Sequence, residues 1–170
     1  MKRKFVCIIL LITLCLTACG RLATEENDYD GPSKYDGLSE YQEVRLSGQA
    51  GTISVHIPEG WESISFPASE ISDSYKIQFY PENVEKGYIE LEYWESFAVC
   101  GTGLVSKKIT ISGDTANMGT YNKKKYWDFI AYKGKNNGLV AYTFDVADWW
   151  DVYATQVMEI LNTASINAED

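Results

Sequence analysis

The residues of this chain that could support nucleophilic catalysis are Cys100 and His56. His56 is the only histidine, and Cys100 lies in the sequence Val-Cys-Gly-Thr-Gly. A thiolate nucleophile needs a base such as histidine, and glycines allow close approach to the backbone. The apolar neighbours of Cys100 favour a buried, inert thiol, and strand alternation turns His56 away from the apolar residues around it. We interpret both as structural residues and keep a Cys100–His56 enzyme as the alternative.

Three carboxylates, Glu90, Glu92 and Glu95, lie close enough in sequence for paired acid–base chemistry. Glycosidases use two carboxylates about 5 to 10 Å apart across a cleft. A period of two places Glu90 and Glu92 on one face of a strand, and burying both without partners would be costly. The sequence therefore predicts a solvated sheet face, with Lys107 and Lys108 as candidate ion-pair partners.

The aromatic residues offer a binding surface, because 5 Trp and 12 Tyr exceed what one small core usually takes. Trp149 and Trp150 are adjacent in a segment with helical periodicity, and neighbouring helical residues point about 100° apart. We expect one of the two to cover a neighbouring element or to form a platform for a sugar, a peptide or a protein partner. Trp149 and Trp150 are therefore the predicted binding residues.

A weak metal-binding pattern occurs near the N-terminus, where Asp28, Asp30 and Gly31 resemble the core of a calcium loop. The pattern fails at the twelfth position, where Gly37 replaces the required bidentate carboxylate. We interpret the segment as a solvated linker. The sequence predicts no metal site and no cofactor.

The N-terminus has the organisation of a secretory leader. Lys2, Arg3 and Lys4 precede an apolar run over residues 5–16, which is shorter than the about 20 residues of a membrane span. Small residues then precede a cysteine in Leu-Thr-Ala-Cys, residues 16–19. This sequence resembles the lipobox of bacterial lipoproteins. The resemblance implies that Cys19 receives a diacylglyceryl group, that residues 1–18 are removed, and that the lipid anchors the chain to the cell membrane on its extracytoplasmic face.

Removal of the leader makes the chain more acidic. Residues 1–18 carry three of the 15 basic residues and none of the 24 acidic ones, so the mature net charge is −12. Such a charge argues against a nucleic-acid partner, because phosphates require a basic surface. Only Cys100 remains as a free thiol in the mature chain, so an internal disulfide is excluded.

Composition divides the mature chain into two parts. Residues 19–48 are polar and acidic without sustained periodicity, which predicts a flexible tether. Residues 49–170 show short alternating runs separated by Gly, Pro, Asn and Asp, as in an antiparallel sheet. The expected strands cover residues 53–57, 62–66, 75–80, 88–94, 107–112, 116–121, 126–132 and 139–144.

A helix is expected near the C-terminus, where apolar residues recur at spacings of three and four over residues 149–161. Asp145 or Asp148 could cap its first turn, Asn162 could end it, and an extended tail would follow through Ile166. The sequence thus predicts an α+β domain in which an antiparallel sheet is flanked by helices.

The order of these elements resembles the PsbP-like superfamily over residues 51–166. The resemblance rests on Ile-Pro-Glu-Gly-Trp at 57–61, Tyr-Trp-Asp-Phe-Ile at 126–130 and Met-Glu-Ile-Leu-Asn-Thr at 158–163. It implies an antiparallel sheet flanked by helices, as in many secreted bacterial lipoproteins. The chain departs from the family between Trp61 and Tyr75, where little room remains for the expected helix.

Together these features predict a lipid-anchored extracytoplasmic lipoprotein that acts without catalysis, as a binding or accessory module at the cell envelope. Its expected partners are the membrane, through the N-terminal lipid anchor, and an envelope protein. Two alternatives remain: an envelope enzyme that uses Cys100 with His56, and a structural subunit of an envelope complex, which requires an exposed apolar patch.

Overall fold

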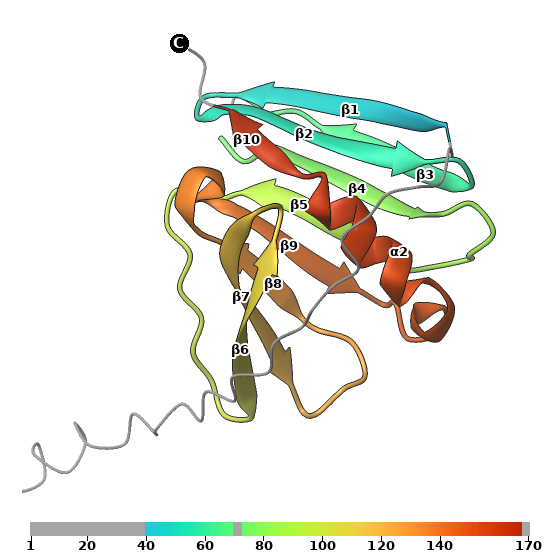
Figure 1. The fold of residues 1–170 in the computed structure, drawn as a ribbon, viewed down its shortest axis with the longest axis vertical. Coiled ribbons are helices and arrows are strands. Elements are labelled where there is room, and N and C mark those ends of the chain that lie inside the picture. Colours follow the sequence, from blue (N-terminus) through green and yellow to red (C-terminus); the bar gives the residue numbers. More distant parts are fainter. Residues whose placement is uncertain (1–39, 70–72, 168–170) are drawn as a thin grey trace, which may run out of the picture.

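The computed structural model describes residues 40–69 and 73–167, which form mainly antiparallel β-structure. Figure 1 shows two sheets with an α-helix beside them. The strands are β1 (Tyr41–Gly48), β2 (Gly51–Pro58), β3 (Trp61–Phe66), β4 (Lys76–Pro81), β5 (Tyr88–Tyr93), β6 (Leu104–Ile111), β7 (Asp114–Tyr121), β8 (Phe129–Tyr132), β9 (Leu139–Phe144) and β10 (Ser165–Asn167). The helical elements are the short 3-10 helix η1 (Gly134–Asn136) and α2 (Trp150–Asn162).

The smaller sheet has the strand order β1-β2-β10. The predicted alternation in β2 is confirmed, because Ile53, Val55 and Ile57 are buried whereas His56 is exposed. The short strand β10 pairs with the other edge of β2, with Ile166 opposite Ile53. This pairing returns the end of the described chain to its first hairpin (Figure 1).

Strand β1 corrects the predicted extent of the tether. The prediction places residues 41–48 in a flexible segment, whereas these residues pair with β2 at all eight positions. Val44 and Leu46 are half-buried against the core, and β2 supplies hydrogen-bond partners for the backbone of β1. Two alternating apolar residues are too short a signal to reveal a strand whose stability comes from its neighbour. The folded part of the chain therefore begins before residue 49.

The larger sheet has the strand order β3-β4-β5-β9-β8-β7-β6. Strands β3, β4 and β5 follow one another as hairpins, and β6 to β9 form a second antiparallel run whose last strand pairs with β5. The strands expected from the sequence are confirmed within a few residues, and the match is complete for Leu139–Phe144. In this order, three strands (β9, β8 and β7) lie between β5 and β6, although β5 and β6 are consecutive in sequence.

The main core lies between the inner face of the larger sheet, strand β2 and helix α2. It contains Phe79, Ile89, Leu91 and Ile130 from the sheet, together with Ile160 and other residues of the helix. In Figure 1, α2 lies beside both sheets and leads directly into β10. The apolar face of the helix is thus buried against residues of both sheets, as the helical periodicity of the sequence predicts.

The ends of α2 differ from the expected capping. Asn162 is the last helical residue, as predicted, but no side chain caps the first turn. The ammonium group of Lys86 instead lies 3.6 Å from Asp145 and 3.2 Å from Asp148. These carboxylates pair with a cation from another loop, so they do not accept the first backbone N–H groups of the helix.

The fold class is therefore broadly β-rich and only loosely α+β. Two antiparallel sheets supply most of the structure, and α2 is the single α-helix of the described residues. Residues 67–69 and 73–75, which border the place where a helix follows the first hairpin in the PsbP-like family, are not helical.

Candidate binding groove

The site is created by the connection between β5 and β6, residues 94–103, which we call the crossover segment. Because β9, β8 and β7 lie between these two strands, the segment must span about 19 Å, or four strand spacings. It does so across the outer face of the larger sheet, which is the face away from α2, and Phe97 makes its main contact there. The sheet order therefore places a loop over a sheet face.

Phe97 anchors the crossover segment on a small second core. This core contains Phe129, Ala131 and Val140, which are buried on the outer face. The ring of Phe97 packs edge-on against Phe129, with centroids 5.1 Å apart, and against Tyr142 at 6.1 Å. Such aromatic pairs contribute about 0.5–1.5 kcal/mol each beyond the area they bury. The segment is held at its centre, while the residues that follow Phe97 are exposed.

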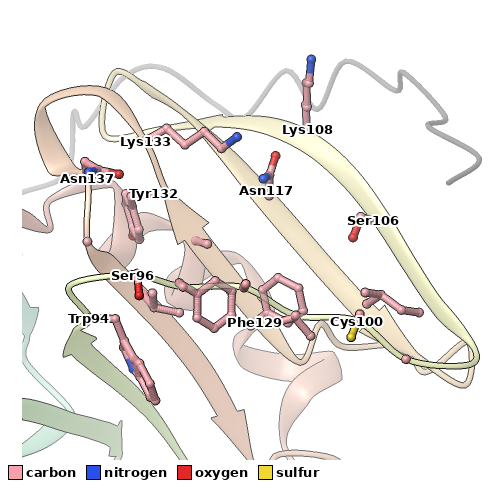
Figure 2. A pocket seen from close by; sticks show the side chains of 18 of the residues that line it. Trp94, Ser96, Cys100, Ser106, Lys108, Asn117, Phe129, Tyr132, Lys133 and Asn137 are labelled. Carbon is pink, nitrogen blue, oxygen red and sulfur yellow. The ribbon is translucent and has the colours of Figure 1, made fainter. Parts of the chain in front are cut away.

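An open hollow of about 1040 Å³ lies between the crossover segment and strands β6, β7 and β8. We call it the outer groove. Figure 2 shows Trp94, Ser96, Phe129 and Cys100 along one side of it and Ser106 on β6 opposite. Its lining comprises Trp94, Glu95, Ser96, Phe97, Ala98, Val99, Cys100, Gly101, Thr102, Leu104, Val105, Ser106, Lys107, Lys108, Asn117, Phe129, Ala131, Tyr132, Lys133, Asn137, Gly138 and Val140.

Lysines gather at one end of the outer groove. Strand register places Lys108 of β6 opposite Asn117 of β7, and Asn117 opposite Ala131 of β8. Lys133 follows Ala131 on the same face, and Figure 2 shows its side chain extending toward Asn117. Among the described residues, no carboxylate lies within ion-pair distance of Lys107, Lys108 or Lys133. Lys108 and Lys133, which lie on the outer face, can therefore bind an external anion.

The predicted solvated face of Glu90 and Glu92 is wrong, because both carboxylates are buried, with exposed fractions of 5% and 9%. Each has polar partners from the neighbouring strand or loop. Glu90 accepts hydrogen bonds from Gln78 at 2.7 Å and from Lys76 at 2.9 Å. A buried carboxylate is tolerated when it is paired and hydrogen-bonded in this way. The predicted partners Lys107 and Lys108 lie on β6, at the far edge of the sheet.

Glu92 also has partners on this face. It accepts hydrogen bonds from the Ser74 hydroxyl and from the Trp94 indole, the latter at 2.9 Å. Both carboxylates raise the pKa of Tyr142 on the adjacent strand, although burial is the larger cause of that shift. The hydrogen bond to Glu90 is the main cause that raises the pKa of Lys76. This network fixes Trp94 at the start of the crossover segment, and we assign it a structural role.

Cys100 and His56 do not form a catalytic pair. Cys100 is exposed on the wall of the outer groove, which contradicts the expected buried thiol, because the crossover segment lies outside both cores. His56 lies on the smaller sheet in a separate polar hollow of about 490 Å³. Its Nε2 atom is 4.0 Å from Glu43, which is itself bound to Arg45 at 2.9 Å. The hydrogen bond from Arg45 lowers the pKa of Glu43.

Trp149 and Trp150 are buried, with exposed fractions of 5% and 7%, so neither forms the predicted platform. Trp149 packs edge-on against Trp61, and its indole donates to the Lys86 carbonyl at 3.0 Å. Trp150 packs against Trp127. Trp149 precedes the helix with a non-helical backbone. The 100° divergence expected within a helix therefore does not apply to this pair, and both rings reach the core.

Several sequence predictions fall outside the described residues: the signal peptide at 1–18, the lipid attachment at Cys19, residues 19–39 of the tether, and the calcium-like pattern at Asp28, Asp30 and Gly31. The described ranges hold no group of three or more His, Cys, Asp and Glu side chains placed to bind a metal ion. Within the same ranges, no helix has the length and hydropathy needed to cross a bilayer.

The outer groove was not among the sequence predictions, although the sequence contains a signal for it. All four residues of β8, Phe-Ile-Ala-Tyr, are buried, as are the first three of β9. A continuous apolar run in a strand indicates that both faces of the sheet are covered. The run at 129–132 therefore required a layer over the outer face, which the crossover segment provides.

In comparisons with known proteins, no protein-family model, curated protein or solved structure matches the chain. Function must therefore be argued from the site.

Proposed function

We propose that this protein is a lipid-anchored, extracytoplasmic binding module that acts without catalysis and captures its ligand in the outer groove. The observation that carries the proposal is the groove itself, a concave site of about 1040 Å³ with an apolar floor and polar groups at its rim. Binding sites for small molecules share this composition and occupy about 300–1,000 Å³. The groove is the larger of the two hollows described above.

The lining of the outer groove does not include His56, which was the base that the sequence offered to Cys100. The residues that line the outer groove include a thiol and three lysines but no histidine, and their one carboxylate is Glu95. A cysteine nucleophile needs a neighbouring base or a lowered pKa. We therefore prefer a binding role to the envelope enzyme that uses Cys100 with His56.

The envelope location is proposed from the leader and Cys19. Replacing Cys19 with Ser should release the protein from membranes, because one thioether-linked diacylglyceryl group supplies the anchor. Fractionation of cells that produce the wild type and the Cys19→Ser variant measures this. A variant that still sediments with membranes contradicts the lipid anchor.

The finer family assignment is also a proposal: the domain is a diverged PsbP-like domain. Its support is the order of elements, with an opening strand, the Pro58–Trp61 turn, a series of antiparallel strands and a closing helix. The single α-helix of the described residues is a departure from the flanking helices of that family. Fold membership would not by itself define the ligand.

Ligand capture in the outer groove can be tested with a neutral apolar dye whose fluorescence rises on burial. The Ser106→Trp variant places a large ring on the β6 side of the groove, so dye binding should fall at least several-fold. Thr110→Trp is the matched control, because Thr110 lies on the same face of the same strand but does not line the groove. Equal dye binding by both variants contradicts a binding role for the groove.

Exposed apolar side chains outside the groove floor favour an alternative function, in which the domain binds a partner protein. Ile64, Phe66, Trp94 and Phe144 are large apolar residues with exposed fractions of 38–44%. Alternation along β3 places Ile64 and Phe66 on the face opposite the buried Trp61, next to β4. Crosslinking of the native membrane protein tests this alternative, which requires one stoichiometric neighbour joined through this surface.

A further inference from the structure

We infer that the ligand of the outer groove is an amphiphilic anion, a small molecule in which a carboxylate or phosphate group is attached to an apolar chain or ring. The inference rests on the proposed function, since it assigns a ligand class to the same groove. It depends on the separation of lysines and exposed apolar side chains within one concave surface.

The charge of the groove is opposite to that of the protein. The whole chain has a net charge of −9, whereas the groove has two lysines on its outer face, Lys108 and Lys133, and one carboxylate, Glu95. Lys107 also borders the groove, but it lies opposite Met118 on the inner side of β6. Glu95 follows Trp94 at the start of the crossover segment. Four other lysines of the described residues, Lys76, Lys86, Lys124 and Lys125, have acidic partners, whereas Lys123 and Lys135 have none and lie outside the groove. Cations left unpaired on an acidic protein concentrate a negatively charged ligand at one point.

The geometry at this end suits an oxyanion. Lys108 lies on β6 and Lys133 directly follows β8, on either side of β7, and Asn117 of β7 lies between them on the same face. Two ammonium groups and an amide can together donate several hydrogen bonds to one carboxylate or phosphate. In Figure 2, Lys108 reaches beyond the rim while Lys133 lies along it, so an anion at this end remains open to solvent.

The rest of the groove suits an apolar group. Val99 of the crossover segment is 36% exposed and lines the groove, and Leu104 of β6 lines it from the other side, where it packs against the outer-face core. Ala98 is also exposed there, above the buried floor formed by Phe129 and Val140. Covering these side chains with a chain or ring removes apolar surface from water and favours binding. An inorganic anion would leave this surface exposed.

Protection of Cys100 provides a direct test, because this thiol lies in the groove wall. The full-length protein is held in zwitterionic nanodiscs, and a neutral maleimide is added with octyl phosphate, octanoate, octanol, octyl trimethylammonium or inorganic phosphate. Mass spectrometry of the peptide that contains Cys100 gives the labelling rate. We expect octyl phosphate and octanoate to slow labelling at lower concentrations than the other three compounds.

Charge variants separate the ligand class from the existence of the groove. Lys108→Gln and Lys133→Gln should each raise the half-protecting concentration of octyl phosphate about 2- to 5-fold. Lys123→Gln is the matched control, since Lys123 is exposed in the β7–β8 turn, lacks an ion pair among the described residues and does not line the groove. The half-protecting concentration of octanol should be the same in all of these variants. Added salt should weaken protection by the anionic probes only.

The possible outcomes fall into distinct classes. Equal protection by octyl trimethylammonium, or no effect of the two groove lysines, overturns the anion preference but leaves a binding groove. Equal protection by inorganic phosphate overturns the requirement for an apolar group. Stronger protection by an acidic peptide than by octyl phosphate overturns the small-molecule assignment. Protection by none of the compounds contradicts the proposed binding function itself.

Discussion

The ring of Phe129 lies directly over the backbone of Gly119 on the adjacent strand. The two residues are opposite each other in the β7–β8 register, and a Cβ atom at Gly119 would overlap the Phe129 ring carbons. The same ring contacts Phe97 of the crossover segment. The absence of a side chain at Gly119 therefore lets the Phe129 ring lie close to the sheet. The position of that ring in turn determines where Phe97, and with it the crossover segment, packs.

Gly119→Ala should destabilise the protein by about 1–3 kcal/mol, because the added methyl group must displace the Phe129 ring. Urea unfolding measures the loss. In a Phe129→Ala background, which is itself destabilised, the same substitution should cost much less, since the clash is gone. An equal cost in both backgrounds would show that the two residues are not coupled.

Phe97→Ala should loosen the crossover segment from the sheet. The substitution removes three edge-on aromatic contacts, with Trp94, Phe129 and Tyr142, from a half-buried residue, for an expected cost of about 1–3 kcal/mol. Limited proteolysis should detect faster cleavage within residues 94–103, together with weaker dye binding in the groove. Val99→Ala, in the exposed part of the same segment, is the control and should change stability by less than about 0.5 kcal/mol.

Lys76→Met should destabilise the protein by about 1–3 kcal/mol, because it leaves the buried Glu90 carboxylate with Gln78 as its remaining donor. Chemical unfolding near pH 7 measures the effect. The double variant Lys76→Met/Glu90→Leu should recover part of the loss, since the unpaired charge is removed. Lys86→Met breaks only exposed ion pairs and should cost much less than Lys76→Met.

Stability should fall as the pH rises above about 10, because burial raises the pKa of Tyr132 and of Tyr142 above the ordinary value. A raised pKa means that the folded state holds these protons more tightly than the unfolded state. Their contribution is therefore complete below about pH 10 and is lost as the pH increases. In Tyr142→Phe the alkaline decline should be shallower, as measured by unfolding between pH 8 and 11. An unchanged slope would exclude Tyr142 as a source.

Truncation of Trp149 should mainly lower stability, whereas truncation of Trp94 should mainly weaken ligand binding. Trp149→Ala removes a buried ring and its hydrogen bond to the Lys86 carbonyl, so we expect a loss of about 3–5 kcal/mol. Trp94→Ala removes a ring that is 43% exposed together with its hydrogen bond to Glu92, so it should cost less than Trp149→Ala, while it weakens ligand binding in the outer groove. Thermal unfolding and dye titration of both variants distinguish a core tryptophan from a surface one.

Local patterns predicted most of the strands and the closing helix. The alternation around His56 and the three- and four-residue spacing before Asn162 reflect which side of one element is buried, and that information is local. The end of the tether was not predictable in the same way, because β1 is stable only when paired with β2. The positions of Asp145 and Asp148 relative to Lys86 likewise depend on a loop distant in sequence.

The candidate site depended almost wholly on tertiary structure. Burial of Glu90 is favourable only because β4 brings Lys76 and Gln78 beside it, and the period of two alone could not reveal those partners. Cys100 is exposed because its segment crosses the sheet surface instead of entering the core. Both corrections follow from the strand order, which brings distant residues together.

The sequence by itself determined the β-rich character, the amphipathic closing helix and the net negative charge, because each depends on residue type and short spacing. Only the tertiary structure decided that β5 and β6 lie apart in the sheet, and so that residues 94–103 must cross its outer face. The groove beneath that segment, and the lysines gathered at one end of it, exist because strand pairing is set by the packing of the whole chain and not by any local pattern.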